Sequence, residues 1–198
     1  PLTFCFGLTA GVAPIAAKIY AQRKSDTLSA VFRNGNWTAL AAGLVMGGLM
    51  AIGIPVLSLL DQPEAVIVFA EPYIYLLALS ILPQALFLNA KNFTEGLEWM
   101  RPALYVSLAS VPINFFLNYL LIFGPWIFPA WGLVGAGVAT VMTRFLMLGL
   151  IWLFMNYSRF NQYLSFDFQG DRKIIQKILS LGIPAGFQYT FETGAFVA

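Results

Sequence analysis

Residues 111–140 read VPINFFLNYLLIFGPWIFPAWGLVGAGVAT, two apolar helical segments joined by a turn rich in proline and tryptophan. Asn114 and Asn118 stand four residues apart in the first segment and therefore share one helix face. The second segment opens with small and polar residues, which are Gly132, Gly135, Gly137 and Thr140. This pattern is typical of membrane helices that pack closely and place a few polar groups in a dry interior.

The composition of the chain places it in the membrane. Hydrophobic residues make up 59% of the 198 residues and charged residues 10%, whereas a soluble domain carries about 25% charged residues. The chain has no histidine and a single cysteine, Cys5. These counts exclude zinc proteases, haem ligation, thiolate metal clusters and catalytic pairs that need histidine, so we expect no enzyme and no cofactor.

The apolar runs predict an all-α, polytopic membrane helical bundle. The chain opens with the end of one span, residues 2–15, which Pro14 could kink. A final helix starts near residue 174. The first residue is Pro1 and the last lies inside an apolar run, so we expect a fragment of a longer protein. Four complete spans are predicted between the two ends, over residues 37–60, 67–89, 103–123 and 132–155.

The basic residues predict the orientation of the bundle. Four, two and four Lys or Arg residues lie in the connections 18–36, 91–101 and 156–177, and none lies in 61–66 or 124–131. Because basic connections stay on the cytoplasmic side, these three are expected to be cytoplasmic. The sequence thus predicts a multi-pass protein of the inner (plasma) membrane.

Polar residues inside the predicted spans have two interpretations each. Asn114 and Asn118 could form interhelical hydrogen bonds or could offer amide oxygens to a cation, and their spacing alone favours the structural role. Thr140 could bond its own helix or join the same site. Arg144, one turn further along, could extend toward the cytoplasmic end or pair inside the bundle.

The last predicted helix contains a carboxylate, Glu192, with Gln188 one turn earlier on the same face. An acidic group inside a membrane span is a functional candidate, because it can load and release a proton or bind a cation. The alternative is a carboxylate near a helix end in contact with water. The functional interpretation is favoured.

Four stretches of the chain resemble the MATE (multidrug and toxic compound extrusion) family, on its bacterial, NorM-like branch. Their order and spacing across nearly the whole chain make the resemblance specific. They are FTEGL at 93–97 with Arg101-Pro102; NFFLNYLLIFG at 114–124 with Phe128-Pro129-Ala130 and 132–140; Phe166-Asp167-Phe168 with 181–184; and Gln188 with Glu192-x-Gly194-Ala195-Phe196.

The resemblance implies a twelve-helix transporter of two six-helix lobes, of which this chain covers about helices two to seven. Residues 1–155 would then form most of the N-terminal lobe, 156–177 the connection between lobes, and 178–198 the start of the C-terminal lobe. Glu192 resembles the family's cation-binding glutamate. Asn114, Asn118 and Thr140 resemble its N-lobe polar site, although some members have aspartate at the position of Asn118. The first helix, which usually supplies an N-lobe aspartate, is absent.

The function implied is a secondary antiporter that exports small organic, often cationic and amphipathic, compounds in exchange for Na⁺ or H⁺ by alternating access. We expect a monomer in the lipid bilayer with no nucleic-acid partner. One alternative is a flippase for a lipid-linked saccharide, which several intramembrane basic residues would favour; only Arg144 is present. The other alternative is a membrane scaffold that transports nothing.

Overall fold

The computed structural model describes residues 2–54, 64–125, 129–158, 160–164 and 170–197. Every regular element within these ranges is helical, which confirms the predicted all-α bundle. The elements are α1 (Leu2–Ala10), α2 (Val12–Ala21), α3 (Ser25–Ile52), α4 (Glu64–Gly96), α5 (Arg101–Phe123), α6 (Gly132–Asn156), the 3-10 helix η2 (Asn161–Tyr163) and α7 (Arg172–Val197).

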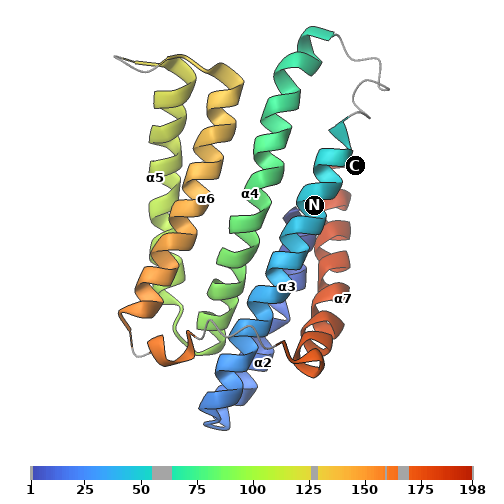
Figure 1. Ribbon diagram of the computed structural model, residues 1–198, viewed down its shortest axis with the longest axis vertical. Coiled ribbons are helices and arrows are strands. Elements are labelled where there is room, and N and C mark those ends of the chain that lie inside the picture. Colours follow the sequence, from blue (N-terminus) through green and yellow to red (C-terminus); the bar gives the residue numbers. More distant parts are fainter. Residues whose placement is uncertain (1, 55–63, 126–128, 159, 165–169, 198) are drawn as a thin grey trace.

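The long helices form a bundle whose connections alternate between its two ends. The links α2–α3, α4–α5 and α6–α7 lie at the lower end of Figure 1, and the link α5–α6 lies at the upper end. The three basic connections therefore share one end, as the alternation in the sequence predicted. Within the described residues, five helical segments are long and apolar enough to cross a membrane, which are Thr3–Ala21, Ser25–Ile52, Ala70–Gly96, Arg101–Phe123 and Gly132–Asn156.

Several helices extend further than the apolar runs predicted. α3 starts at Ser25 rather than near Trp37, and α4 continues to Gly96, through much of the connection expected at 91–101. In α4 the extension carries an i,i+4 ion pair between Lys91 and Glu95, at 3.5 Å, which favours helix in water. Helix α7 begins at Arg172, close to the start expected near residue 174. The connections are thus shorter than predicted, because a helix does not end where its hydrophobic stretch ends.

The first span breaks where its proline predicts. α1 ends at Ala10 and α2 begins at Val12, so that Gly11 separates them. Pro14 lacks the N–H that would bond the carbonyl of Ala10, which accounts for a break one turn earlier. Pro83 lies inside α4, which it does not end.

Two glycine pairs bring α1 into backbone contact with α7. A Cβ atom at Gly7 would fall on the backbone of Gly186 and Ala185, and one at Gly182 would fall on the backbone of Leu8. A Cβ atom at Gly11 would lie 2.8 Å from the carbonyl oxygen of Ile178. The first segment, α1 with the adjoining Gly11, and helix α7 thus each present a G-x-x-x-G pair to the backbone of the other, 7 with 11 and 182 with 186. We call this contact the glycine interlock.

Glycines also set the distance between α3 and α4. A Cβ atom at Gly43 would lie 3.0 Å from the Cα atom of Leu82. A Cβ atom at Gly47 would lie 2.8 Å from the carbonyl oxygen of Ala78. A Cβ at the next glycine, Gly48, would meet nothing within 4 Å, so Gly48 takes no part in this contact. Gly48 lies one residue beyond the contact face and is half-buried.

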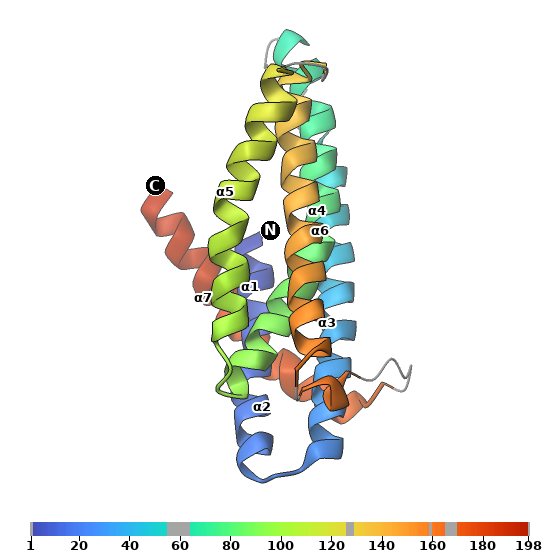
Figure 2. The same cartoon turned by 90° about the vertical axis from the view of Figure 1, so that its left-hand side faces the viewer.

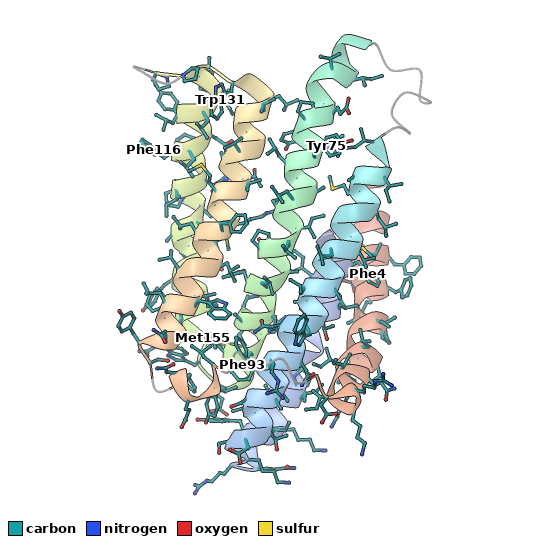
Figure 3. The ribbon with its side chains drawn as sticks, viewed as in Figure 1. Phe4, Tyr75, Phe93, Phe116, Trp131 and Met155 are labelled. Atoms are coloured by element: carbon teal, nitrogen blue, oxygen red, sulfur yellow. The ribbon has the colours of Figure 1, made fainter. Side chains whose placement is uncertain are left out.

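A hydrophobic core joins α2, α3, α4, α6 and η2 at the basic end of the bundle. Phe93 and Met155, both labelled in Figure 3, lie at this end and are 0% exposed. The ring of Phe93 packs on Phe32 with centroids 4.8 Å apart. By contrast, large apolar side chains such as Phe115 and Phe116 on α5 are exposed, as expected for a surface that faces lipid. The core therefore holds the basic end rigid.

Substitution within the glycine interlock should weaken the fold. We expect Gly182→Ala to lower the free energy of unfolding of the complete protein by about 1–3 kcal/mol, because its methyl group would overlap the backbone of Leu8. Thermal unfolding in detergent measures the change. The matched control is Gly194→Ala on the same helix, where a Cβ meets nothing within 4 Å and higher helix propensity predicts an unchanged or raised stability. Equal effects of the two substitutions would contradict the interlock.

Candidate functional site

A polar hollow of about 360 Å³ opens between α4, α5 and α6. Its lining mixes amide, hydroxyl and guanidinium groups with two apolar side chains, which are Gln84, Ser110, Val111, Asn114, Thr140, Thr143, Arg144 and Met147. Three of the residues predicted from the sequence, Asn114, Thr140 and Arg144, are thus brought together. We call this space the polar hollow.

A chain of hydrogen bonds runs along the α5 side of the polar hollow. Asn118 Nδ2 donates to Asn114 Oδ1 at 2.9 Å and also to the backbone oxygen of Asn114 at 2.9 Å. Asn114 Nδ2 in turn donates across to Thr143 Oγ1 on α6, at 3.1 Å. The bond from Asn114 to Thr143 is the interhelical hydrogen bond that was one of the two roles expected for the asparagine pair. A role in cation binding stays a prediction.

Thr140 and Thr143 both bond their own helix. The hydroxyl of Thr140 donates to the carbonyl of Ala136 at 2.9 Å, and that of Thr143 to the carbonyl of Ala139 at 2.8 Å. The Thr143 oxygen accepts from Asn114 as well, so it has one donor and one acceptor partner. Thr140 lines the polar hollow but takes no part in the chain from Asn118 to Thr143.

Arg144 is held inside the bundle. Its Nη1 donates to the hydroxyl of Ser80 on α4, and that hydroxyl donates to the carbonyl of Leu77 at 2.6 Å. Ser80 is 0% exposed, and Arg144 is half-buried near the middle of α6. Of the two alternatives for Arg144, internal pairing is therefore the one observed, and the extended position toward the helix end is not.

The charge of Arg144 determines what the polar hollow can bind. Its lining contains one guanidinium and no carboxylate. A cation placed on the oxygens of Asn114 and Thr143 would face this positive charge without a compensating anion. By themselves, the described residues of the polar hollow suit hydrogen-bond acceptors or anionic groups better than Na⁺.

The second predicted site lies on α7. Gln188 Nε2 donates to Glu192 Oε1 at 2.9 Å, which confirms that the two side chains share a face. Both side chains are exposed. Helix α7 packs chiefly on α1 and also on α3, whereas the polar hollow is built by α4, α5 and α6. Figure 2 shows the carboxyl end of α7 diverging from the rest of the bundle. The structure therefore divides the predicted residues into two separate groups.

The sequence prediction missed four polar residues of the polar hollow and its surroundings. Ser80 and Gln84 stand four apart on α4, the same spacing that drew attention to Asn114 and Asn118, and this signal could have found them. Thr143 lies between the two predicted residues Thr140 and Arg144. Ser110 had no signal beyond its polarity.

A cluster of buried amides was also missed. Asn89 on α4 is 0% exposed and donates from Nδ2 to Asn36 Oδ1 on α3, at 2.8 Å. Asn34, also 0% exposed, accepts at Oδ1 from the backbone N–H of Asp171, at 2.8 Å. This second bond attaches the start of α7 to α3. The amides therefore stabilise the position of α7 at the basic end.

The fold and its polar site can now be compared with known proteins. The family model described as MatE matches residues 2–120. The chain belongs to the MatE family. The probable multidrug resistance protein NorM of Bacillus licheniformis is 33% identical over 205 residues, which cover 97% of this chain and 43% of the relative. The chain thus spans less than half the length of this relative.

Two solved structures share the fold of this MatE chain. An inward-facing multidrug resistance MATE family transporter of the MOP superfamily superposes with a TM-score of 0.83 at 20% identity, over 95% of this chain and 42% of its own. An outward-facing MATE family transporter of the same superfamily gives 0.84 at 21% identity, over 98% and 43%. Both structures thus share the helical fold that the sequence predicted.

The hydrogen-bond chain predicts unequal effects of the two asparagines. Asn114→Ala should destabilise the complete protein by about 1 kcal/mol and Asn118→Ala by about half as much, because Asn114 loses two partners and the bond to α6. Thermal unfolding in detergent measures both. Thr140→Val, whose hydroxyl bonds only its own helix, serves as control with a smaller effect. A larger loss for Asn118→Ala than for Asn114→Ala would contradict the assignment.

Proposed function

We propose that the complete protein is a secondary active antiporter that exports small organic, often cationic and amphipathic, compounds in exchange for Na⁺ or H⁺. Membership of the MatE family and the similarity to a NorM protein along nearly the whole chain support this proposal. The similarity to inward-facing and outward-facing transporters supports an alternating-access mechanism, because one lobe fold serves both conformations in those proteins.

The observation that carries the proposal is the set of partners around Glu192. It is a carboxylate on a helix that packs against a membrane-crossing segment, and its hydrogen-bond partner is the neutral amide of Gln188. No basic side chain pairs with it within the described part of the chain. The carboxylate is therefore available to a proton or to Na⁺, and Gln188 can orient the oxygen that remains.

The polar hollow would serve the same cycle in a different way. Asn114, Asn118 and Thr140 are proposed as supporting groups of the N-lobe site, with Arg144 as a structural or cavity residue. Because the hollow is positively charged, its ion coupling would need an anionic group beyond those that line it here. Glu192 is therefore the main coupling residue in our proposal.

We propose that the protein lies in the inner membrane of the cell. Its basic connections would face the cytoplasm. All three basic connections lie at one end of the bundle, which supports this orientation. We also propose that the protein functions as a monomer. A flippase for a lipid-linked saccharide is disfavoured, because such a cavity would need several basic residues and the polar hollow has Arg144 alone.

Replacing Glu192 should abolish coupled export. We expect Glu192→Gln in the complete protein to reduce efflux of a fluorescent organic cation from vesicles at least tenfold, with Na⁺ and pH gradients imposed separately. The substitution keeps the side-chain volume and a hydrogen bond to Gln188 but removes the charge that binds the coupling ion. Whichever gradient drives efflux in the unmodified protein identifies the ion.

The matched control is Glu95→Gln, which removes a carboxylate that pairs with Lys91 at the end of α4. It should leave efflux unchanged, with equal protein in the vesicles. Undiminished gradient-driven efflux by Glu192→Gln would remove Glu192 from the mechanism. Gradient-driven efflux absent from the unmodified protein would instead favour the scaffold interpretation.

A further inference from the structure

A second pocket, of about 470 Å³, lies at the basic end of the bundle. The end of α2, the start of α3, the α4–α5 connection and η2 enclose it. Its lining consists of Ala17, Tyr20, Ala21, Arg23, Lys24, Ser25, Leu28, Gly96, Glu98 and Tyr163. It shares no residue with the polar hollow or with the Glu192 site, so the proposed transport function does not account for it. We call it the basic-end pocket.

Two adjacent cations line this pocket without a carboxylate partner. Neither Arg23 nor Lys24 forms an ion pair in the part of the chain that the structure describes, and both are exposed. Glu98 is the one carboxylate in the lining. The lining thus carries a net positive charge. An unpaired arginine and lysine side by side suit a phosphate group, which the guanidinium can bind in bidentate fashion and the ammonium as a point charge.

Tyr163 adds a hydroxyl donor to the lining of the pocket. Its side chain is 8% exposed, and its ring packs on Phe93 and Phe160 with centroids 6.3 and 6.1 Å apart. Its hydroxyl forms no hydrogen bond with the described residues, and its oxygen is not among their buried polar atoms without a partner, so it is open to the pocket. Because Tyr163 lines the basic-end pocket, an acceptor bound there would satisfy it.

The backbone of the α2–α3 turn adds further donors. Arg23 has the left-handed value φ = 55°, rare for a side chain of its size, and its N–H bonds the carbonyl of Tyr20 at 3.0 Å. The first N–H of α3 that bonds into the helix from this turn is that of Leu28, to the carbonyl of Lys24 at 3.2 Å. The preceding N–H groups, from Ser25 onward, are the free donors of a helix N-terminus and favour an anion.

The position of the pocket identifies the source of the phosphate. The pocket belongs to a multi-pass membrane protein, and the α2–α3 turn that lines it lies at the end where the basic connections gather (Figure 1). Lysine and arginine next to a membrane span attract anionic lipid head groups. We propose that the basic-end pocket binds the phosphate of an anionic membrane phospholipid, with Arg23, Lys24 and the hydroxyl of Tyr163 as its ligands.

Lipid titration of the complete protein in detergent, read by native mass spectrometry, tests this proposal. We expect phosphatidylglycerol to bind and phosphatidylcholine, which has no net charge, to bind at least tenfold more weakly. The double variant Arg23→Ala/Lys24→Ala should lose about twentyfold in affinity for phosphatidylglycerol. Tyr163→Phe, which keeps the ring contacts with Phe93 and Phe160, should lose about threefold.

The matched control is Arg172→Ala/Lys173→Ala, which removes the same charge at the same end but outside the pocket. It should bind phosphatidylglycerol like the unmodified protein. Equal affinities of the two double variants, or an unchanged affinity of Tyr163→Phe, would overturn the site. Displacement of the lipid by an equal concentration of soluble glycerol phosphate would overturn the lipid as the source and assign the site to a free phosphate ester.

Discussion

The backbone contact between α1 and α7 is the constraint on which the rest of the structure depends. In a bilayer, lipid tails are as apolar as leucine, so helices associate through close packing rather than through the hydrophobic effect. Gly7 and Gly186 bring the two backbones together at one level and Gly182 with Leu8 at another. The hydrogen bond from the backbone N–H of Asp171 to the buried Asn34 attaches the start of the same helix to α3. Helix α7, and with it Glu192, is therefore positioned by glycines and one buried amide.

Charge divides the molecule into parts with different chemistry. The polar hollow holds the guanidinium of Arg144 between α4 and α6, where its bond to Ser80 offsets part of the cost of burial. Glu192 stands on a separate helix with only an amide for partner. In our proposal, a coupling ion is therefore drawn to the carboxylate on α7 rather than to the hollow. In our proposal, the two groups are coupled by movement of α7 relative to α4–α6, the kind of motion that alternating access requires.

Local patterns in the sequence predicted local features of the structure. The spans, the alternating connections, the break near Pro14 and the shared face of Gln188 and Glu192 all depend on spacing within one helix, and the structure confirms them. The helix ends were wrong because polar residues such as those of 25–36 continue a helix beyond its apolar part. The contacts that position the sites could not be predicted, since they join residues far apart, as in Arg144 with Ser80. The G-x-x-x-G pairs were visible in the sequence, but nothing there identified them as partners.

Site-directed cross-linking tests the glycine interlock most directly. The rings of Phe4 on α1 and Phe187 on α7 lie edge to face with centroids 5.5 Å apart. In the complete protein, with Cys5 replaced by serine and any cysteine beyond this chain also replaced, the pair Phe4→Cys/Phe187→Cys should cross-link readily with a short bifunctional thiol reagent. The pair Phe4→Cys/Phe116→Cys, whose second site is on the exposed face of α5, should not. The interlock predicts that Gly182→Leu abolishes the first cross-link. Undiminished cross-linking in that variant would contradict it.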